Sequence, residues 1–150
     1  MENEPLLQVK GLKKYFPVKK GLLRRTVAQL RAVDGVDLSI QHGETVGLVG
    51  ESGCGKTTLG RTILRTQKPT AGEVLFRKSD GSRVDLAQLK GETLRSVRPQ
   101  IQMIFQDPMS SLNPRMTVLD IVSEPLVANR LARGQELVDR VTFLLDKVSL

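Results

Sequence analysis

Aromatic, cysteine and histidine residues are scarce in this sequence. Its 150 residues include no Trp, one Tyr, one Cys and one His. A single cysteine excludes an internal disulfide and favours a reducing compartment. The few aromatic residues argue against a surface on which single-stranded nucleic acid stacks. No stretch approaches the roughly 20 apolar residues of a membrane span, and the short, acidic residues 1–5 do not resemble a signal peptide.

Positive charge is concentrated near the N-terminus. The net charge is +7, and one stretch holds a cluster of basic residues: Lys13, Lys14, Lys19, Lys20, Arg24, Arg25 and Arg31. Such a cluster is typical of a patch for nucleic acid or anionic lipid, and equally of a solvated loop. We take the solvated loop as the default interpretation and leave the two binding hypotheses open. The length predicts one domain.

A glycine-rich octapeptide is the most informative feature of the chain. Residues 50–57, Gly-Glu-Ser-Gly-Cys-Gly-Lys-Thr, fit the pattern G-x-x-x-x-G-K-[ST] of a phosphate-binding loop. Chance would give this match roughly once in 200 chains of this size. The context strengthens the prediction, because residues 45–49 have the composition of a buried strand and residues 56–66 that of a helix. Strand, glycine loop and helix follow one another in the confirmed examples of this motif.

Each residue type in this loop has a chemical purpose. Glycines allow backbone conformations closed to other residues and a close approach to a phosphate. Successive N–H groups can then form an anion nest at the positive end of a helix. Lys56 supplies a mobile charge for the β- and γ-phosphates, and the Thr57 hydroxyl is the expected magnesium ligand. Cys54 is interpreted as a small filler, with a catalytic or redox thiol as the weaker hypothesis.

Antiparallel strands are predicted before the phosphate loop, at residues 6–12, 27–33 and 36–41. In the last of these, apolar and polar residues alternate as in a half-buried strand. Asp34 and Gly35 predict a hairpin-like turn between the second and third strands. A basic, irregular segment is expected at residues 16–26. His42 falls on the turn that leads to the loop, where an exposed side chain is expected rather than a ligand.

Short strands and then helices are predicted after the phosphate-loop helix. Apolar patterns indicate strands at residues 72–77 and 101–105, the second of them buried. Thr117 is the predicted N-cap of a helix that Pro125 would kink or divide. Gly134 marks a further break. The last helix carries an apolar stripe at helical spacing, formed by Leu137, Val138, Val141, Leu144, Leu145 and Val148.

Two further features complete a family pattern. Tyr15 lies about 35 residues before the glycine loop, and Phe105-Gln106-Asp107-Pro108 lies about 50 residues after it. With the phosphate loop, they resemble the ATPase subunit of ATP-binding cassette (ABC) transporters over residues 7–150. The stretch 104–116 and the basic segment that begins at residue 12 are similar to the subfamily that imports dipeptides and oligopeptides. Relatives of that subfamily import nickel, glutathione or other small solutes.

The resemblance assigns roles to individual residues. Gln106 corresponds to the glutamine-loop residue, which completes the magnesium shell and senses the γ-phosphate. A neutral amide suits that role because it coordinates metal and water without adding charge. Tyr15 corresponds to the aromatic residue that stacks on adenine, with Phe16 as the fallback and an ordinary core aromatic as the alternative. The residues expected to bind the nucleotide are Tyr15, Gly50, Ser52, Gly53, Cys54, Gly55, Lys56, Thr57 and Thr58. Lys56 and Gln106 are the expected catalytic residues, and Thr57 and Gln106 the expected magnesium ligands.

The resemblance also implies the fold. It is an α/β fold of the P-loop NTPase type, in which a RecA-like core carries an antiparallel β-subdomain and the start of an α-helical subdomain. The chain would be the N-terminal portion of one such ABC nucleotide-binding domain. Residues 1–49 are expected to form mainly the antiparallel β-subdomain and the strand before the phosphate loop, and residues 50–66 the phosphate loop and its helix. Residues 67–106 are expected to return to the β-subdomain and then form the core strand that leads to the glutamine loop. Residues 107–150 would begin the helical subdomain.

Several motifs of this family do not occur in the sequence. They are the Leu-Ser-Gly-Gly-Gln signature, an apolar strand ending in Asp-Glu, and the switch histidine. Phosphoryl transfer depends on positioned groups that stabilise charge, and these motifs supply part of them. We therefore expect ATP hydrolysis from the full-length protein. We expect this chain to be an inactive fragment that binds ATP and Mg²⁺ at best.

Partners and location follow from the same resemblance. The expected partners are transmembrane permease subunits, a second ATP-binding subunit in a homo- or heterodimer, and indirectly an extracytoplasmic peptide-binding protein. No nucleic acid is expected. The protein would lie peripherally on the cytoplasmic face of a bacterial-type inner membrane. The alternatives are a nucleic-acid-linked ABC ATPase that uses the basic segment, and a small kinase, which the 49 residues before the loop disfavour.

Overall fold

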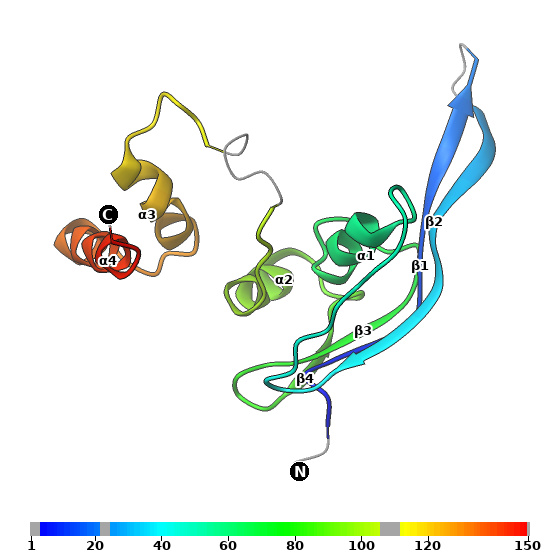
Figure 1. Ribbon diagram of the computed structural model, residues 1–150, viewed down its shortest axis with the longest axis horizontal. Coiled ribbons are helices and arrows are strands. Elements are labelled where there is room, and N and C mark those ends of the chain that lie inside the picture. Colours follow the sequence, from blue (N-terminus) through cyan, green and yellow to red (C-terminus); the bar gives the residue numbers. More distant parts are fainter. Residues whose placement is uncertain (1–3, 22–24, 106–111, 150) are drawn as a thin grey trace. The chain divides into compact units, whose positions relative to one another are not determined.

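An antiparallel sheet organises the first part of the chain. The computed structural model describes residues 4–21, 25–105 and 112–149. The chain divides into two compact units, Met1–Gln102 and Met103–Leu150. The sheet, in the first unit, has the strand order β2-β1-β3-β4, and each neighbouring pair is antiparallel (Figure 1). The strands are β1 (Leu7–Lys20), β2 (Arg25–Ile40), β3 (Ala71–Arg77) and β4 (Arg83–Asp85).

β1 and β2 form one long ribbon, which corrects two predictions. The expected hairpin turn at Asp34 and Gly35 does not form, because β2 passes through both residues and pairs with β1 on either side of them. Gly35 instead takes a positive φ of 72° at an irregularity in the pairing, the place of the extra residue in a β-bulge. The irregular segment expected at residues 16–26 is also wrong for its described residues 16–20 and 25–26, because β1 continues to Lys20 and β2 begins at Arg25.

The core of the first unit lies between the sheet and its helices. These are α1 (Lys56–Ile63), α2 (Gly91–Val97) and a 3₁₀ turn at Arg98–Gln100. The buried cluster consists of Val9, Leu12, Val33, Leu59, Ile63, Val74, Phe76, Leu86 and Val97. At Gly72, which has a φ of 94°, β3 approaches β1 so closely that a Cβ would lie 2.5 Å from the Gly11 carbonyl oxygen. Only glycine suits that crossing.

Arg65 ends α1 and ties it to the segment after β4. The helix was predicted to reach residue 66, but Arg65 adopts a left-handed conformation with a φ of 56°. Its side chain is buried, and its Nε donates to the Leu86 carbonyl at 2.7 Å while a terminal nitrogen donates to the Leu89 carbonyl at 2.9 Å. These bonds satisfy a buried charge and fix the far end of the helix that begins in the phosphate loop.

Two predicted buried strands are absent from the described structure. Residues 45–49 and 101–105 contain no strand, and several of their apolar side chains are exposed, with Val49 at 91% and Ile104 at 94%. Ile101 is half-buried against the core of the first unit. Both predictions were therefore wrong for this structure. The physical reason is that a strand needs neighbours to pair its backbone groups, and neither segment joins the sheet described above.

The second unit consists of two helices, α3 (Val118–Ala128) and α4 (Gly134–Lys147). Ser123, Ala132 and Val141 are its buried side chains among the described residues. Pro125 neither ends nor divides α3, and Gly134 is the first residue of α4, so the predicted break lies at a helix start. Among the residues that the structure describes, we find no helix with the length and apolar character needed to cross a membrane.

Thr117 caps α3 as predicted, and this cap gives a first testable prediction. The Thr117 hydroxyl accepts from the Asp120 backbone N–H at 3.1 Å, and the Asp120 carboxylate accepts from the Thr117 N–H at 3.3 Å. Thr117→Ala removes this capping box and should destabilise α3 by about 1 kcal/mol. Faster hydrogen exchange in the first turn of α3 is the expected result. The control Thr142→Ala, on the exposed side of α4, should not change exchange in α3.

Candidate functional site

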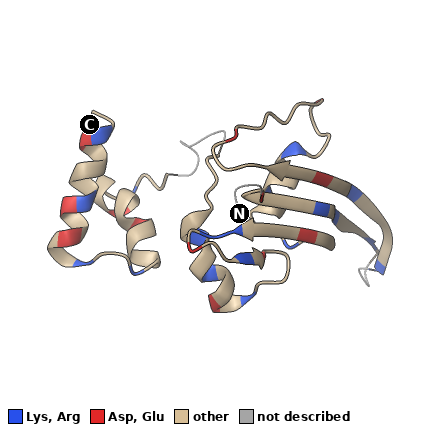
Figure 2. Ribbon diagram, turned by 90° about the horizontal axis from the view of Figure 1, so that it is seen from below, with Lys and Arg blue, Asp and Glu red and all other residues tan. Residues whose placement is uncertain are grey.

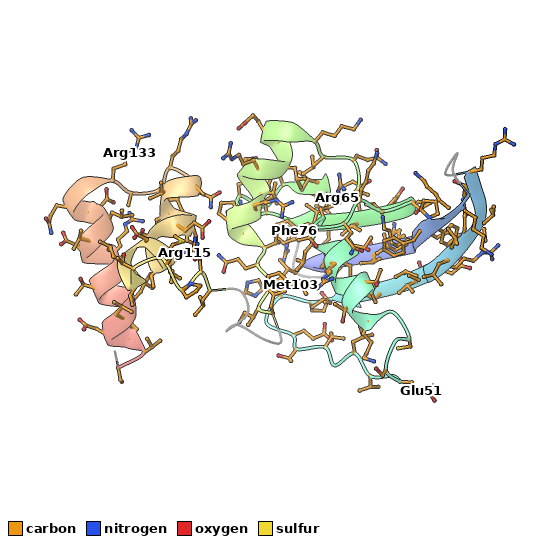
Figure 3. The ribbon with its side chains drawn as sticks, turned by 90° about the horizontal axis from the view of Figure 1, so that it is seen from above. Glu51, Arg65, Phe76, Met103, Arg115 and Arg133 are labelled. Atoms are coloured by element: carbon orange, nitrogen blue, oxygen red, sulfur yellow. The ribbon has the colours of Figure 1, made fainter. Side chains whose placement is uncertain are left out.

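The phosphate loop connects an extended segment to the N-terminus of α1. Three of its glycines have positive φ angles, 156° at Gly50, 80° at Gly53 and 104° at Gly55, the N-cap of the helix. The first turn of α1 contains no acidic residue, so nothing within it opposes an anion at the positive helix end. The Glu51 side chain lies on the outer side of the loop and points away from the sheet (Figure 3). The loop therefore has the backbone geometry that its sequence predicted.

Two of these glycines stand where a side chain would collide with the protein. A Cβ at Gly50 would lie 2.8 Å from the Cys54 sulfur, and one at Gly55 would lie 2.3 Å from the Ala32 carbonyl oxygen. Ala32 belongs to β2, where the pairing with β1 skips it between Lys14↔Val33 and Tyr15↔Arg31. This irregularity brings the Ala32 carbonyl against the start of α1. The backbone of the loop at Gly55 therefore packs closely against the backbone of β2.

Lys56 reaches back across the loop. Its Nζ donates to the Gly50 carbonyl at 2.7 Å and to the Glu51 carbonyl at 2.6 Å, and it lies 3.6 Å from the Cys54 sulfur. A three-donor ammonium can hold two carbonyls and keep a further hydrogen for another acceptor. The charge of Lys56 therefore sits beside the backbone that would surround a phosphate.

A cleft of about 230 Å³ lies between β2 and the phosphate loop. Val33 and Asp34 line it from β2, and Cys54, Gly55 and Lys56 line it from the loop. The lining is largely apolar, since Val36, Leu48, Val49 and Leu59 also contribute to it. An apolar cleft with a few charged groups at its edge is the usual form of a small-molecule site.

Tyr15 is joined to the edge of this cleft through Asp34. Its hydroxyl donates to the Asp34 carboxylate, its backbone N–H donates to the Thr70 hydroxyl at 2.9 Å, and the Arg31 guanidinium lies 5.6 Å from its ring centre. The hydrogen bond from Tyr15 holds the pKa of Asp34 below its usual value. The same bond, together with burial, raises the pKa of Tyr15. Arg31 thus lies against the ring that was predicted to stack on adenine.

This bond gives a prediction with a definite sign. A carboxyl whose folded pKa is lowered stabilises the fold above its unfolded pKa, and that stabilisation is lost as pH falls through the folded pKa. Tyr15→Phe removes the main cause, so the pKa of Asp34 should rise toward its ordinary value, as followed by carboxyl-carbon NMR. The pKa of Asp80, which the Ser82 hydroxyl and Lys78 hold low, should stay unchanged. An unchanged pKa of Asp34 would contradict the role given to Tyr15.

The other predicted site residues divide into three groups. Ser52, Thr57 and Thr58 lie at the loop and the first turn of α1, with Thr57 exposed. Phe16 shares β1 with Tyr15, but its ring is covered by the Lys14 ammonium, 4.7 Å from the ring centre. Gln106 lies outside the described residues. Its predicted roles as magnesium ligand and catalytic residue therefore remain predictions.

The donor set at the loop suits a magnesium-bound nucleotide. Within residues 4–21, 25–105 and 112–149, no group of three or more His, Cys, Asp or Glu side chains could hold a metal ion. Mg²⁺ does not need such a group, because it keeps several waters and binds few protein ligands together with phosphate oxygens. One hydroxyl, that of Thr57, beside a cradle of glycines fits this mode of binding.

Sequence reasoning missed two residues of the site. Asp34 was assigned to a turn, yet it receives hydrogen bonds from Tyr15 and Arg31 and lines the cleft. Ala32 was given no role, although its carbonyl oxygen lies so close to Gly55 that it leaves no room for a side chain there. No side-chain pattern could have identified Ala32, because the contact is made by its backbone. Asp34 could have been suspected as the first carboxylate after a long basic stretch.

Comparisons with known proteins agree with this geometry. Residues 33–150 match the family model described as ABC transporter. The chain is 47% identical over 149 residues to the oligopeptide transport ATP-binding protein AppF of Bacillus subtilis (strain 168), covering 99% of this chain and 44% of that protein. It is 46% identical over 147 residues to the glutathione import ATP-binding protein GsiA of Pectobacterium atrosepticum, covering 98% of this chain and 23% of that protein. The chain thus spans less than half the length of either curated relative.

A solved structure resembles the described fold. It is the dimeric, post-hydrolysis state of the ATP-binding cassette MJ0796 bound to ADP and Pi. The TM-score is 0.71 at 28% sequence identity, and the match covers 96% of this chain and 57% of that chain.

Proposed function

Because this chain belongs to the ABC transporter family, we propose that the protein is the ATP-binding subunit of an importer of dipeptides and oligopeptides. The observation that carries the proposal is the phosphate loop, in which Lys56 spans the carbonyls of Gly50 and Glu51 at the N-terminus of α1. The similarity to the oligopeptide transport protein AppF supports the choice of peptide as the transported solute.

In this proposal each part of the site has a defined task. The N–H groups of the loop and the N-terminus of α1 bind the phosphates, and Lys56 neutralises their charge. Thr57 holds magnesium, and Gln106 completes the metal shell. Tyr15 stacks on the adenine base. This stacking requires the Arg31 guanidinium either to leave the Tyr15 ring or to occupy the face of that ring opposite the base. When bound, the nucleotide supplies a phosphoryl group whose transfer to water releases free energy.

The proposed partners supply what the chain's described residues do not. Transmembrane permease subunits form the path for the peptide, a second ATP-binding subunit faces the nucleotide, and an extracytoplasmic binding protein delivers the solute. The protein then lies on the cytoplasmic face of the membrane and binds it through the permease. Because the 150 residues do not include the Leu-Ser-Gly-Gly-Gln signature, an apolar strand ending in Asp-Glu or the switch histidine, we expect this chain to bind nucleotide at best and to release no phosphate above background.

Glutathione is the second candidate solute, because the chain is 46% identical to a glutathione import protein over almost its whole length. Glutathione is itself a tripeptide, so the two candidates differ in specificity rather than in mechanism. The residues of this chain contact nucleotide in the proposal and not the solute. The permease and the binding protein would therefore determine whether oligopeptides or glutathione are transported.

Uptake by the native host tests the proposal. Deletion of the gene should abolish accumulation of labelled oligopeptides and leave uptake of a labelled sugar unchanged, and the intact gene should restore it. Loss of glutathione uptake with normal peptide uptake would favour the second candidate. Normal uptake of both solutes in the deletion strain would contradict the proposed function.

A further inference from the structure

The outer part of the β1–β2 ribbon carries most of the excess charge of the protein. Residues 5–33 contain eight Lys and Arg and no Asp or Glu, whereas the fifteen basic and fourteen acidic residues of 34–150 almost balance. The net charge of +7 is therefore a property of one region. Lys and Arg mark the outer end of the ribbon in Figure 2. Asp34, the residue after that stretch, forms ion pairs with two of them, Lys13 and Arg31.

The ribbon extends beyond the rest of the sheet. β3 pairs with β1 only as far as Lys13, while β1 and β2 remain paired from there to Lys20 and Arg25 (Figure 1). Past Lys13, β1 therefore has a single neighbouring strand among those described. Pro17, which has no N–H to donate, is tolerated at such an edge. This outer part is a two-stranded arm without a partner layer in the described sheet.

One face of this arm is apolar in the middle and basic at both ends. Directly opposed residues of an antiparallel pair share a face, and the register pairs Phe16 with Leu30 and Val18 with Ala28. Lys14 lies on the same face, and its ammonium is positioned over the Phe16 ring. At the outer end the register pairs Lys20 with Arg25. Leu30 is 60% exposed and Val18 is 41% exposed, so the apolar centre is open to solvent.

We propose that this basic, apolar-centred face of the β1–β2 arm binds the anionic headgroups of a phospholipid membrane. Its Lys and Arg side chains are complementary to lipid phosphates. Its exposed Leu and Val side chains can enter the boundary between headgroups and acyl chains, as the apolar face of an interfacial element does. This surface is separate from the nucleotide cleft, and the inference does not depend on the proposed transport function.

The apolar centre distinguishes this surface from one that binds nucleic acid. Phosphate contacts with DNA or RNA use basic and polar groups, and stacking uses aromatic rings. Here the aromatic ring on the face is Phe16, already covered by Lys14, and the exposed apolar residues Val18 and Leu30 are aliphatic. A membrane interface uses both the aliphatic centre and the basic ends.

Co-sedimentation of the 150-residue chain with vesicles tests the inference. Binding should be strong to phosphatidylcholine vesicles that contain about one third phosphatidylglycerol, weak to phosphatidylcholine alone, and reduced by salt. Lys20→Gln and Arg25→Gln together should weaken binding about 25-fold, because each basic residue contributes about fivefold. The matched control, Lys90→Gln with Arg133→Gln, removes the same charge elsewhere and should have a much smaller effect.

A fluorescent reporter keeps the test independent of variant folding. The chain contains no Trp, so Leu30→Trp introduces a single reporter on the proposed face, and Gln29→Trp introduces one on the opposite face of the same strand. Anionic vesicles should shift the emission of the first to shorter wavelength and change the second less. Equal shifts, equal losses in the arm and control variants, or preference for a DNA duplex over anionic vesicles would each overturn the inference.

Discussion

Gly55→Ala is expected to reduce nucleotide affinity at least 100-fold and to lower the melting temperature of the chain. Gly55 has a φ of 104°, a conformation that costs an L-residue about 1–2 kcal/mol. The added Cβ would also lie 2.3 Å from the Ala32 carbonyl oxygen. That carbonyl cannot turn aside easily, because β2 is paired with β1 on both sides of it. The loop must therefore leave β2, and the helix N-terminus moves with it.

Titration of a fluorescent ATP analogue with magnesium would measure this change. Gly60→Ala is the matched control, since Gly60 lies inside α1 and a Cβ there would meet no described atom within 4 Å. That substitution should leave affinity unchanged and stabilise the helix by about 0.5–1 kcal/mol. If both variants bound the analogue like the original chain, the seating of the loop on β2 would not matter for binding.

Lys56→Ala is expected to weaken nucleotide binding by about 100-fold. A charge-assisted hydrogen bond contributes about 1.5–3 kcal/mol, and each 1.4 kcal/mol is tenfold in affinity. The variant also leaves the carbonyls of Gly50 and Glu51 without the ammonium that now joins them. Loss of the charge and loosening of the loop act in the same direction, so the effect should lie near the upper end of that range.

Two measurements separate these causes. Lys56→Arg keeps the charge but not the compact ammonium, so it should recover part of the affinity if charge dominates. Lys68→Ala, which removes an exposed lysine outside the loop, should bind the analogue normally. Affinity in Lys56→Ala equal to that of the Lys68→Ala control would contradict the role of Lys56. The analogue should also bind more weakly as salt rises, because the contact is electrostatic.

Much of the site was predictable because its determinants are local. The eight residues 50–57 contain the glycines, the lysine and the hydroxyl of a phosphate loop in consecutive order, and the structure places them at the N-terminus of α1 as predicted. The N-cap at Thr117 was found in the same way, from a residue that acts on N–H groups within one turn. The family and the fold were predicted from such motifs, and the comparisons confirm both.

The predictions that failed concern contacts between distant residues. The sequence suggested a turn at Asp34 and Gly35, but pairing with β1 on both sides keeps β2 continuous. It suggested buried strands at residues 45–49 and 101–105, but in the described structure neither segment pairs with a strand of the sheet. An apolar run shows that a segment is suited to burial. Whether the segment is buried depends on the elements that pack against it in the folded protein.

The amino-acid sequence by itself therefore determined the position of the glycine loop before α1, the Thr117 cap and the family. Each of these depends on side chains or glycines only a few residues apart, whose geometry the chain fixes locally. Tertiary structure alone decided that the Ala32 carbonyl seats Gly55, that Asp34 joins Tyr15 to the cleft, and that the basic segment is a paired arm with an open apolar face. These features arise from backbone pairing across the sheet, which no local pattern specifies.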